Sequence, residues 1–280
     1  TISTTATTTS NVGSYTITSA ANNLNANNYN FTYAPGTLTV NKATLTVTAN
    51  NQSRVYGDNN PTLTYAITGF KNNETSSVVS GTPTISTTAA DVSNVGNYTI
   101  TSAANNLSAT NYQFSYVNGS LTITKAPLIV TGVTTSVTYN GLTQTNGTAT
   151  ISGNKGSDKF TILGYATGTN ATTYIDNLSV TSSALGNYNV SYVNGSLVIA
   201  KAPLTVTGVS TTFTYSASAQ TNNPATITGN QGSDSFTISG YARATNVGTY
   251  TDTLSVTSSA LGNYNVSYVN GSLTITKADL

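Results

Sequence analysis

Short segments in which apolar and polar residues alternate recur along the whole chain. In residues 264–268, tyrosine and valine alternate with asparagine and serine, and in residues 273–276 leucine and isoleucine alternate with threonine. An alternation with a period of two is typical of a half-buried β-strand. Between the two segments, Asn270-Gly271 supplies two residues that tolerate the positive φ of a type I′ turn. The pattern therefore predicts a strand, a tight turn and a return strand, as in a β-hairpin.

The predicted hairpin belongs to a repeat that ends in a lysine junction. Successive junction lysines are 83, 76 and 76 residues apart, and residues 178–197 recur unchanged as residues 254–273. A period of this length indicates an array of similar modules, and we expect the chain to be a window from a longer array. Residues 1–42 are then the C-terminal part of a truncated repeat, 43–125 a first full repeat, 126–201 and 202–277 two sister-type repeats, and 278–280 the start of the next repeat. The junction lysines are Lys42, Lys125, Lys201 and Lys277.

The alternation and the turn residues together predict an all-β fold of short, mostly antiparallel strands. Low charge and many polar residues also occur in disordered chains, but abundant β-branched residues and 18 tyrosines favour strands. We expect a tandem array of small β domains, joined end to end into an elongated rod, with tyrosine supplying much of each core. Because proline has no N–H, we expect the strand ladder to break at Pro127 and Pro203.

Composition limits the chemistry that the chain can perform. The sequence contains no cysteine, methionine, tryptophan or histidine, which excludes thiol chemistry, histidine bases and the usual zinc ligands. Only 6% of the residues are charged and the net charge is +1, so we expect no binding of nucleic acid, whose phosphates need a basic surface. No apolar run approaches the roughly 20 residues that span a bilayer. We therefore expect no enzyme activity, no cofactor and no membrane span in this segment.

The first full repeat carries a group of short motifs near its start and its end. These are Lys42-Ala43, Tyr56-Gly57-Asp58, Asn60-Pro61, Leu63-Thr64-Tyr65 and the ending Gly-Ser-Leu-Thr-Ile-Thr-Lys at residues 119–125. Together they resemble the MBG domain of the YGX type, a family found in tandem in large bacterial surface and secreted proteins, including filamentous-haemagglutinin-like adhesins. The resemblance covers the first full repeat and the tail of the truncated repeat. It implies an extracellular array of small β domains without catalytic residues, and it leaves the ligand open.

The two sister-type repeats depart from this pattern in their front halves. Tyr139-Asn140-Gly141 and Tyr215-Ser216-Ala217 stand where the first full repeat has Tyr56-Gly57-Asp58, although the tails keep the common ending. We interpret them as a sister type on the same scaffold, similar to repeats of bacterial adhesins. The strand pairing of their front halves is left open.

Few side chains are candidates for a chemical site. The junction lysines would form isopeptide bonds with asparagine only beside a carboxylic acid, and Asp158 and Asp234 occupy matching positions in the sister-type repeats. Asp176 or Asp252 would be the ligands of a calcium ion at a junction, but calcium needs six to eight oxygen ligands and the sequence has no acidic cluster. A solvated lysine and no bound metal is the simpler interpretation. We therefore assign no catalytic, cofactor-binding or metal-binding residue.

Two functions fit this sequence. The first is a structural repeat segment of a bacterial extracellular adhesin, stalk or biofilm matrix fibre, secreted or on the cell surface. Its partners would be the neighbouring repeats and, laterally, other copies of itself, because strands with few charges leave sheet edges open to association into filaments. The alternative is a set of repeated modules that bind a glycan or a host protein weakly and gain by avidity.

Overall fold

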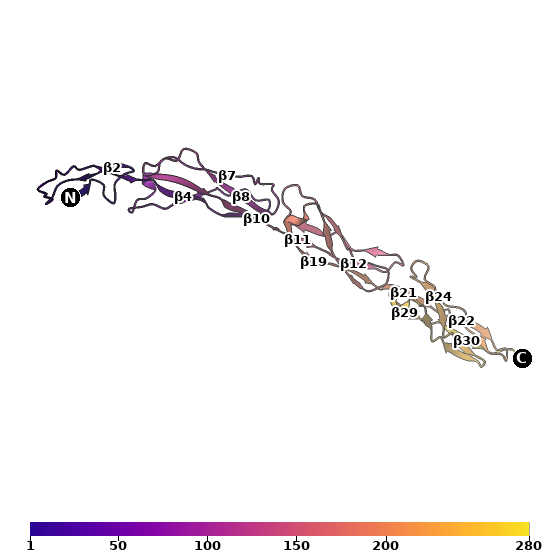
Figure 1. Cartoon of the computed structure of the whole chain (residues 1–280). Coiled ribbons are helices and arrows are strands. Elements are labelled where there is room, and N and C mark those ends of the chain that lie inside the picture. The colour runs from indigo at the N-terminus through magenta and orange to yellow at the C-terminus, as the bar shows by residue number, and fades with distance from the viewer. Residues whose placement is uncertain (280) are drawn as a thin grey trace. The chain divides into compact units, whose positions relative to one another are not determined.

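The computed structural model describes residues 1–279, and this part of the chain consists mainly of β-strands and the loops that join them (Figure 1). Its helical elements are three single turns of 3-10 helix, η1 (Ser76–Val78), η2 (Leu185–Asn187) and η3 (Leu261–Asn263). None of the helical turns in residues 1–279 is long and apolar enough to cross a membrane. The chain separates into unit 1, which contains residues 1–126 and the short segment 186–188, and unit 2, which contains the remainder. The predicted all-β fold class is confirmed.

The truncated repeat at the start of unit 1 forms one small antiparallel sheet. Its strands are β1 (Ile2–Thr4), β2 (Gly13–Ser19) and β3 (Gly36–Val40), and they lie in the order β1-β2-β3. Residues 20–35 connect β2 to β3 without forming a strand. All side chains of this repeat are exposed or half-buried, so it has no buried core of its own.

The first full repeat folds into two sheets that mix parallel and antiparallel pairs. Its strands are β4 (Ala43–Ala49), β5 (Gln52–Val55), β6 (Tyr65–Thr68), β7 (Thr84–Thr87), β8 (Gly96–Ala103), β9 (Tyr112–Val117) and β10 (Gly119–Thr124). One sheet has the order β6-β4-β9 and the other the order β5-β10-β8-β7. The first strand, β4, is parallel to β9, and β5 is parallel to β10, while the other neighbours are antiparallel.

Each sister-type repeat has ten short strands in four small sheets. The second full repeat contains β11 (Ala126–Thr131), β12 (Thr134–Thr138), β13 (Gln144–Thr145), β14 (Thr150–Ser152), β15 (Thr161–Leu163), β16 (Thr167–Gly168), β17 (Thr173–Ile175), β18 (Ser179–Thr181), β19 (Tyr188–Val193) and β20 (Ser196–Ala200). The third full repeat contains β21 (Ala202–Thr207), β22 (Thr211–Thr214), β23 (Gln220–Thr221), β24 (Thr226–Thr228), β25 (Thr237–Ser239), β26 (Arg243–Ala244), β27 (Gly248–Thr251), β28 (Ser255–Thr257), β29 (Tyr264–Val269) and β30 (Ser272–Thr276). The sheets of the third repeat have the orders β24-β21-β29, β22-β30-β27, β23-β26 and β25-β28, and the second repeat has the corresponding four.

The core of each full repeat consists mainly of aliphatic side chains from the central strands. In the third repeat, Leu204 and Val206 of β21 and Leu273 of β30 are fully buried. Each such side chain contributes roughly 1.5–3 kcal/mol by leaving water. The expectation that tyrosine supplies much of the core is only partly correct, because few of the 18 tyrosines are buried. The buried ones are Tyr56, Tyr112, Tyr139, Tyr188 and Tyr264.

The hairpin predicted at Asn270-Gly271 is wrong. β29 and β30 belong to different sheets, so the chain crosses from one sheet to another at Asn270-Gly271. Neither residue has a positive φ. A Cβ on Gly271 would overlap the backbone carbonyl oxygen of Val209, and the Asn270 side chain accepts a hydrogen bond from the Leu254 N–H at 3.3 Å. Gly271 is therefore required by its close contact with the backbone of Val209, and Asn270 by its side-chain hydrogen bond to Leu254.

The strand ladder also continues through the junction proline of the third repeat. Pro203 is registered with Asn265 of β29 in a parallel ladder that runs unbroken from Ala202 to Thr207. On the other side of β21, β24 pairs only with residues 205–207. Pro203 therefore has a ladder neighbour on one side only, a position that proline tolerates. The predicted break at this proline is wrong.

Candidate functional site

A pair of asparagines connects the two repeats of unit 2. Asn263 ends η3 in the third repeat, and its side-chain amide reaches residues 170–171 of the second repeat. Its Oδ1 accepts a hydrogen bond from the Ala171 N–H at 2.7 Å, and its Nδ2 donates to Oδ1 of Asn170 at 3.2 Å. Asn263 is only 7% exposed, so these bonds replace water for both ends of its amide. We call this arrangement, one amide bound to an asparagine and to the next N–H of the preceding repeat, the asparagine clamp.

Unit 1 contains the same clamp twice. Between the truncated and first full repeats, Asn111 donates to Asn11 at 2.9 Å and accepts from the following N–H at 3.0 Å. Asn187, which belongs to unit 1, donates to Asn94 and accepts from the N–H after it, both at 2.9 Å. The clamp is therefore a repeated property of this chain, common to the first full repeat and the sister type.

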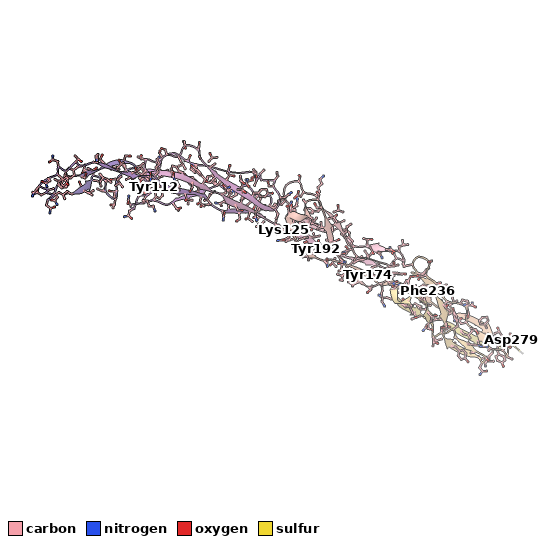
Figure 2. All side chains as sticks on the ribbon, in the orientation of Figure 1. Tyr112, Lys125, Tyr174, Tyr192, Phe236 and Asp279 are labelled. Atoms are coloured by element: carbon pink, nitrogen blue, oxygen red, sulfur yellow. The ribbon has the colours of Figure 1, made fainter. Side chains whose placement is uncertain are left out.

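A tyrosine follows each clamp asparagine and begins the next strand. In unit 2, the ring of Tyr264 packs edge-on against Tyr139 of the preceding repeat, with ring centroids 5.4 Å apart. It also packs against the ring of Phe236, labelled in Figure 2, at 5.2 Å. The hydroxyls of Tyr264 and Tyr139 both donate to Oδ2 of Asp234, at 2.6 and 2.9 Å. Oδ2 of Asp234 therefore accepts hydrogen bonds from tyrosines of two successive repeats.

This environment stabilises the neutral form of both hydroxyls. Burial raises the pKa of Tyr264 from 10 to about 12, and the hydrogen bond to Asp234 acts in the same direction. Burial, and then the bond to the same carboxylate, also raises the pKa of Tyr139. Both tyrosines therefore remain hydrogen-bond donors at neutral pH.

Unit 1 places aromatic rings beside its clamps in a similar way. The ring of Tyr56 packs edge-on against Tyr188, with centroids 5.5 Å apart. Tyr112, also labelled in Figure 2, donates its hydroxyl to Oε2 of Glu74, and this hydrogen bond raises the pKa of Tyr112. Glu74 thus binds Tyr112 as Asp234 binds Tyr264, although the two acids differ in length.

Each sister-type repeat also buries one aspartate. In the third repeat, Nδ2 of Asn222 donates to both carboxylate oxygens of Asp252 at 2.9 Å, and the N–H groups of Ala242 and Gly271 donate at 2.8 and 3.2 Å. The second repeat holds Asp176 in the same way. A buried charge requires such hydrogen bonds. The Asp252 carboxylate thereby connects the segments at Asn222, Ala242 and Gly271, which are distant in sequence.

The first full repeat replaces this buried carboxylate with an aliphatic residue. Ile100, which is fully buried, lies opposite Gly119 in the strand register. In the third repeat, Asp252 lies opposite Gly271 in the same way. The Asp252 N–H donates to the carbonyl oxygen of Gly271 at 2.9 Å. The scaffold can therefore form with either residue, and the aspartate belongs to the sister type.

Three of the acids considered from the sequence, Asp176, Asp234 and Asp252, have hydrogen-bond partners within the chain. Asp234 accepts hydrogen bonds from two tyrosines, and Asp176 and Asp252 accept them from N–H groups. Lys42 donates to the carbonyl oxygen of Ala109 at 3.5 Å. Over residues 1–279, no three His, Cys, Asp or Glu side chains gather into a group that could hold a metal ion. These contacts give Asp176, Asp234 and Asp252 hydrogen-bond partners within the chain.

The asparagine clamp was not predicted from the sequence. Its signal is an Asn-Tyr pair that recurs at residues 28–29, 111–112, 187–188 and 263–264, and an asparagine that recurs at residues 11, 94, 170 and 246. The clamped partners are 100, 93 and 93 residues apart in the sequence. The recurrence alone therefore does not show that the two motifs meet.

Part of the chain matches a known domain family. Residues 1–39 and 45–122 match the family model of the MBG domain (YGX type). The match covers most of the truncated repeat and of the first full repeat, in agreement with the resemblance of their motifs. No curated protein matches the chain.

The solved structures that align with the chain are distant. Drosophila N-cadherin EC1-4 aligns at 8% identity and a TM-score of 0.21, over 64% of this chain and 58% of that one. The I9-I11 tandem from titin aligns at 9% identity and a TM-score of 0.20, over 84% of this chain and 100% of that one. Alignments this weak carry no argument about function.

Proposed function

We propose that this chain is a non-catalytic structural segment of a bacterial extracellular adhesin, stalk or matrix fibre. The observation that carries the proposal is the asparagine clamp, which recurs between successive repeats in both units. A chain of spacers requires the same contact between each pair of successive repeats, and the clamp provides such a contact. The match of residues 1–39 and 45–122 to the MBG domain supports an extracellular location, because the resemblance implies surface and secreted proteins.

The buried polar groups of the sister-type repeats support a structural role. Asp252 and Asn222 bind each other and nearby backbone groups inside the repeat. A catalytic site instead needs a nucleophile or base that faces a substrate. We therefore propose that these groups hold loops together and perform no reaction.

The edges of the sheets offer contacts for lateral association. β9, β19 and β29 each lie at the edge of a sheet and carry no charged residue. β19 and β29 end in Tyr192-Val193 and Tyr268-Val269, whose side chains are 42–55% exposed, and Tyr192 is labelled in Figure 2. An uncharged, exposed edge strand can pair with another chain. We propose these edges as the sites at which copies associate side by side.

A series of lengthened chains tests the spacer role. One and two additional copies of residues 202–277 would be inserted after Lys277, and the maximum dimension would be measured by small-angle X-ray scattering. A spacer should gain a constant increment for each added repeat, roughly 30–40 Å when strands that rise about 3.3 Å per residue follow the long axis. A maximum dimension that stays constant, or grows only as a compact particle would, refutes the spacer role.

A repeated binding module is the second candidate. The same exposed Tyr-Val pairs would offer an aromatic ring and an apolar side chain to a glycan or a host protein in each sister-type repeat, and several weak sites gain by avidity. The test compares the wild-type chain with the double variant Tyr192→Ser, Tyr268→Ser on a glycan array and on immobilised matrix proteins. Binding that the double variant loses, with an unchanged circular dichroism spectrum, supports this candidate. Absence of binding by the wild-type chain refutes it.

A further inference from the structure

The sequence contains five Asn-Gly pairs, at which an asparagine side chain can react with its own backbone. The peptide nitrogen that attacks the side-chain amide belongs to the following residue, and glycine leaves that nitrogen unhindered because it has no side chain. Which pair reacts then depends on how firmly the fold holds the amide and the nitrogen. The pairs are Asn118-Gly119, Asn140-Gly141, Asn146-Gly147, Asn194-Gly195 and Asn270-Gly271.

The two pairs in the tails of the sister-type repeats are held on both residues. Asn270 accepts a hydrogen bond from the Leu254 N–H at 3.3 Å, and the Gly271 N–H donates to the buried carboxylate of Asp252 at 3.2 Å. Asn194-Gly195 has the same two bonds in the second repeat. Both reacting groups are therefore bound to other parts of the repeat.

Two further pairs are also restrained by contacts within their repeats. Asn118 accepts a hydrogen bond from the Ser102 N–H at 3.0 Å. Asn146 is buried and donates to both carboxylate oxygens of Asp176 at 2.9 Å. The Gly147 N–H donates to a threonine hydroxyl at 3.1 Å. A reaction at either pair would first have to break these bonds.

Asn140-Gly141 lies in a different environment, in the loop between β12 and β13. The Asn140 side chain is exposed, and its Oδ1 accepts a hydrogen bond from the N–H of Leu142 in the same loop at 3.0 Å. This bond closes a small ring that includes both Cγ of Asn140 and the peptide nitrogen of Gly141. The two atoms that would react are therefore held in one exposed ring, within reach of water.

We propose that Asn140-Gly141 is a site at which this chain modifies itself. The Gly141 nitrogen, after losing its proton to solvent, forms a bond to Cγ of Asn140. The bond from Cγ to Nδ2 breaks, and Nδ2 takes up a proton and leaves as ammonia. Water then opens the resulting cyclic imide at one of its two carbonyls, which yields either aspartate or isoaspartate. The net reaction converts an amide and water into a carboxylate and ammonium, without an oxidant or a reductant.

The site lies at the junction between the second and third repeats, both of which belong to unit 2. A Cβ on Gly141 would come within 3.2 Å of the backbone of Gly232 in the third repeat. Tyr139, which directly precedes the site, packs against Tyr264 and donates its hydroxyl to Asp234. Either product adds a negative charge to this loop, and isoaspartate also lengthens the backbone by one carbon. The modification therefore loosens the contact of Tyr139 with the third repeat.

Peptide mapping of the wild-type chain tests which pair reacts. The chain would be kept in mildly alkaline buffer, which favours loss of the peptide proton, and sampled over time by tryptic digestion and mass spectrometry. Residues 126–155 form one tryptic peptide with two of the pairs, so fragmentation must assign the change to Asn140 or Asn146. Asn140 should convert about tenfold or more faster than the other four asparagines, because their hydrogen bonds must break first. Conversion that begins at another pair, or proceeds equally at all five, would overturn the proposed site.

A matched variant tests the effect on the junction. Asn140→Ser removes the reactive amide and introduces the residue that the third repeat has at this place, Ser216. The melting temperature of the wild-type chain should fall as Asn140 converts, whereas the variant, kept under the same conditions, should melt as it did when fresh. If Asn140 converts and the wild-type melting temperature stays constant, the proposed loosening of the junction is wrong. A parallel fall in both chains would also refute it, because the loss would then arise elsewhere.

Discussion

Replacing Asn263 by alanine measures how strongly the clamp couples the two repeats of unit 2. The substitution removes two hydrogen bonds, of 2.7 and 3.2 Å, and leaves the half-buried Ala171 N–H without its acceptor. A typical hydrogen bond contributes about 1 kcal/mol net, and a buried donor left unsatisfied costs about 1–3 kcal/mol. We therefore expect the free energy of unfolding of unit 2 to fall by about 2–3 kcal/mol.

Urea unfolding followed by circular dichroism, together with calorimetry, provides the measurement. In an array of repeats, stability is the sum of the intrinsic stability of each repeat and the interface terms between neighbours. The Asn263→Ala variant should therefore also broaden the transition of unit 2 or divide it into two. Asn246→Ala, at the position of the third repeat that matches Asn170, is the control and should change the stability of this chain by less than about 0.5 kcal/mol. Equal effects of the two variants would refute the coupling role of the clamp.

Three other perturbations probe the tyrosine, the sheet crossing and the buried carboxylate. The pKa of Tyr264 in the folded chain is about 12, above the ordinary tyrosine value of 10, so its hydroxyl contributes fully to stability below pH 10 and this contribution is lost as the pH rises toward 12. Tyr264→Phe should therefore weaken the loss of stability between pH 10 and pH 12, measured by urea unfolding. Gly271→Ala should lower stability by more than about 2 kcal/mol in denaturation experiments, since its Cβ would overlap Val209, whereas Gly262→Ala, with nothing within 4 Å, should change it by less than about 0.5 kcal/mol. Asp252→Ala should destabilise the third repeat by about 3 kcal/mol because it leaves buried N–H groups unpaired, and a melting curve equal to that of the wild type would contradict this.

The strands of the third repeat could be predicted from the sequence because burial follows the alternation of residue types. Leu204 and Val206, and likewise Leu273 and Ile275, are buried at every second position. The order of the strands could not be predicted in the same way. An Asn-Gly pair favours a tight turn locally, but close backbone contact at Gly271 and hydrogen bonds across the repeat select a crossing between sheets instead.

The clamp and the buried carboxylate depend on contacts that the sequence does not reveal. Asn263 lies in a motif whose recurrence is visible, but its role rests on Asn170, which is 93 residues away. Asparagine is abundant in this chain, so no single one stands out as a junction residue. Asp252 is equally hard to predict, because the same place in the first full repeat holds the aliphatic Ile100.

The parallel pairing of the first and last strands of the third repeat has a mechanical consequence. In the third repeat, the chain enters through β21 and leaves through β30, and β21 is parallel to β29 while β30 is parallel to β22. A force that pulls on the two ends of the repeat therefore slides these strands along their neighbours instead of peeling them away one pair at a time. Along β21, the six registered pairs from Ala202 to Thr207 carry the load together. We therefore expect the third repeat to resist tension through these parallel ladders loaded together.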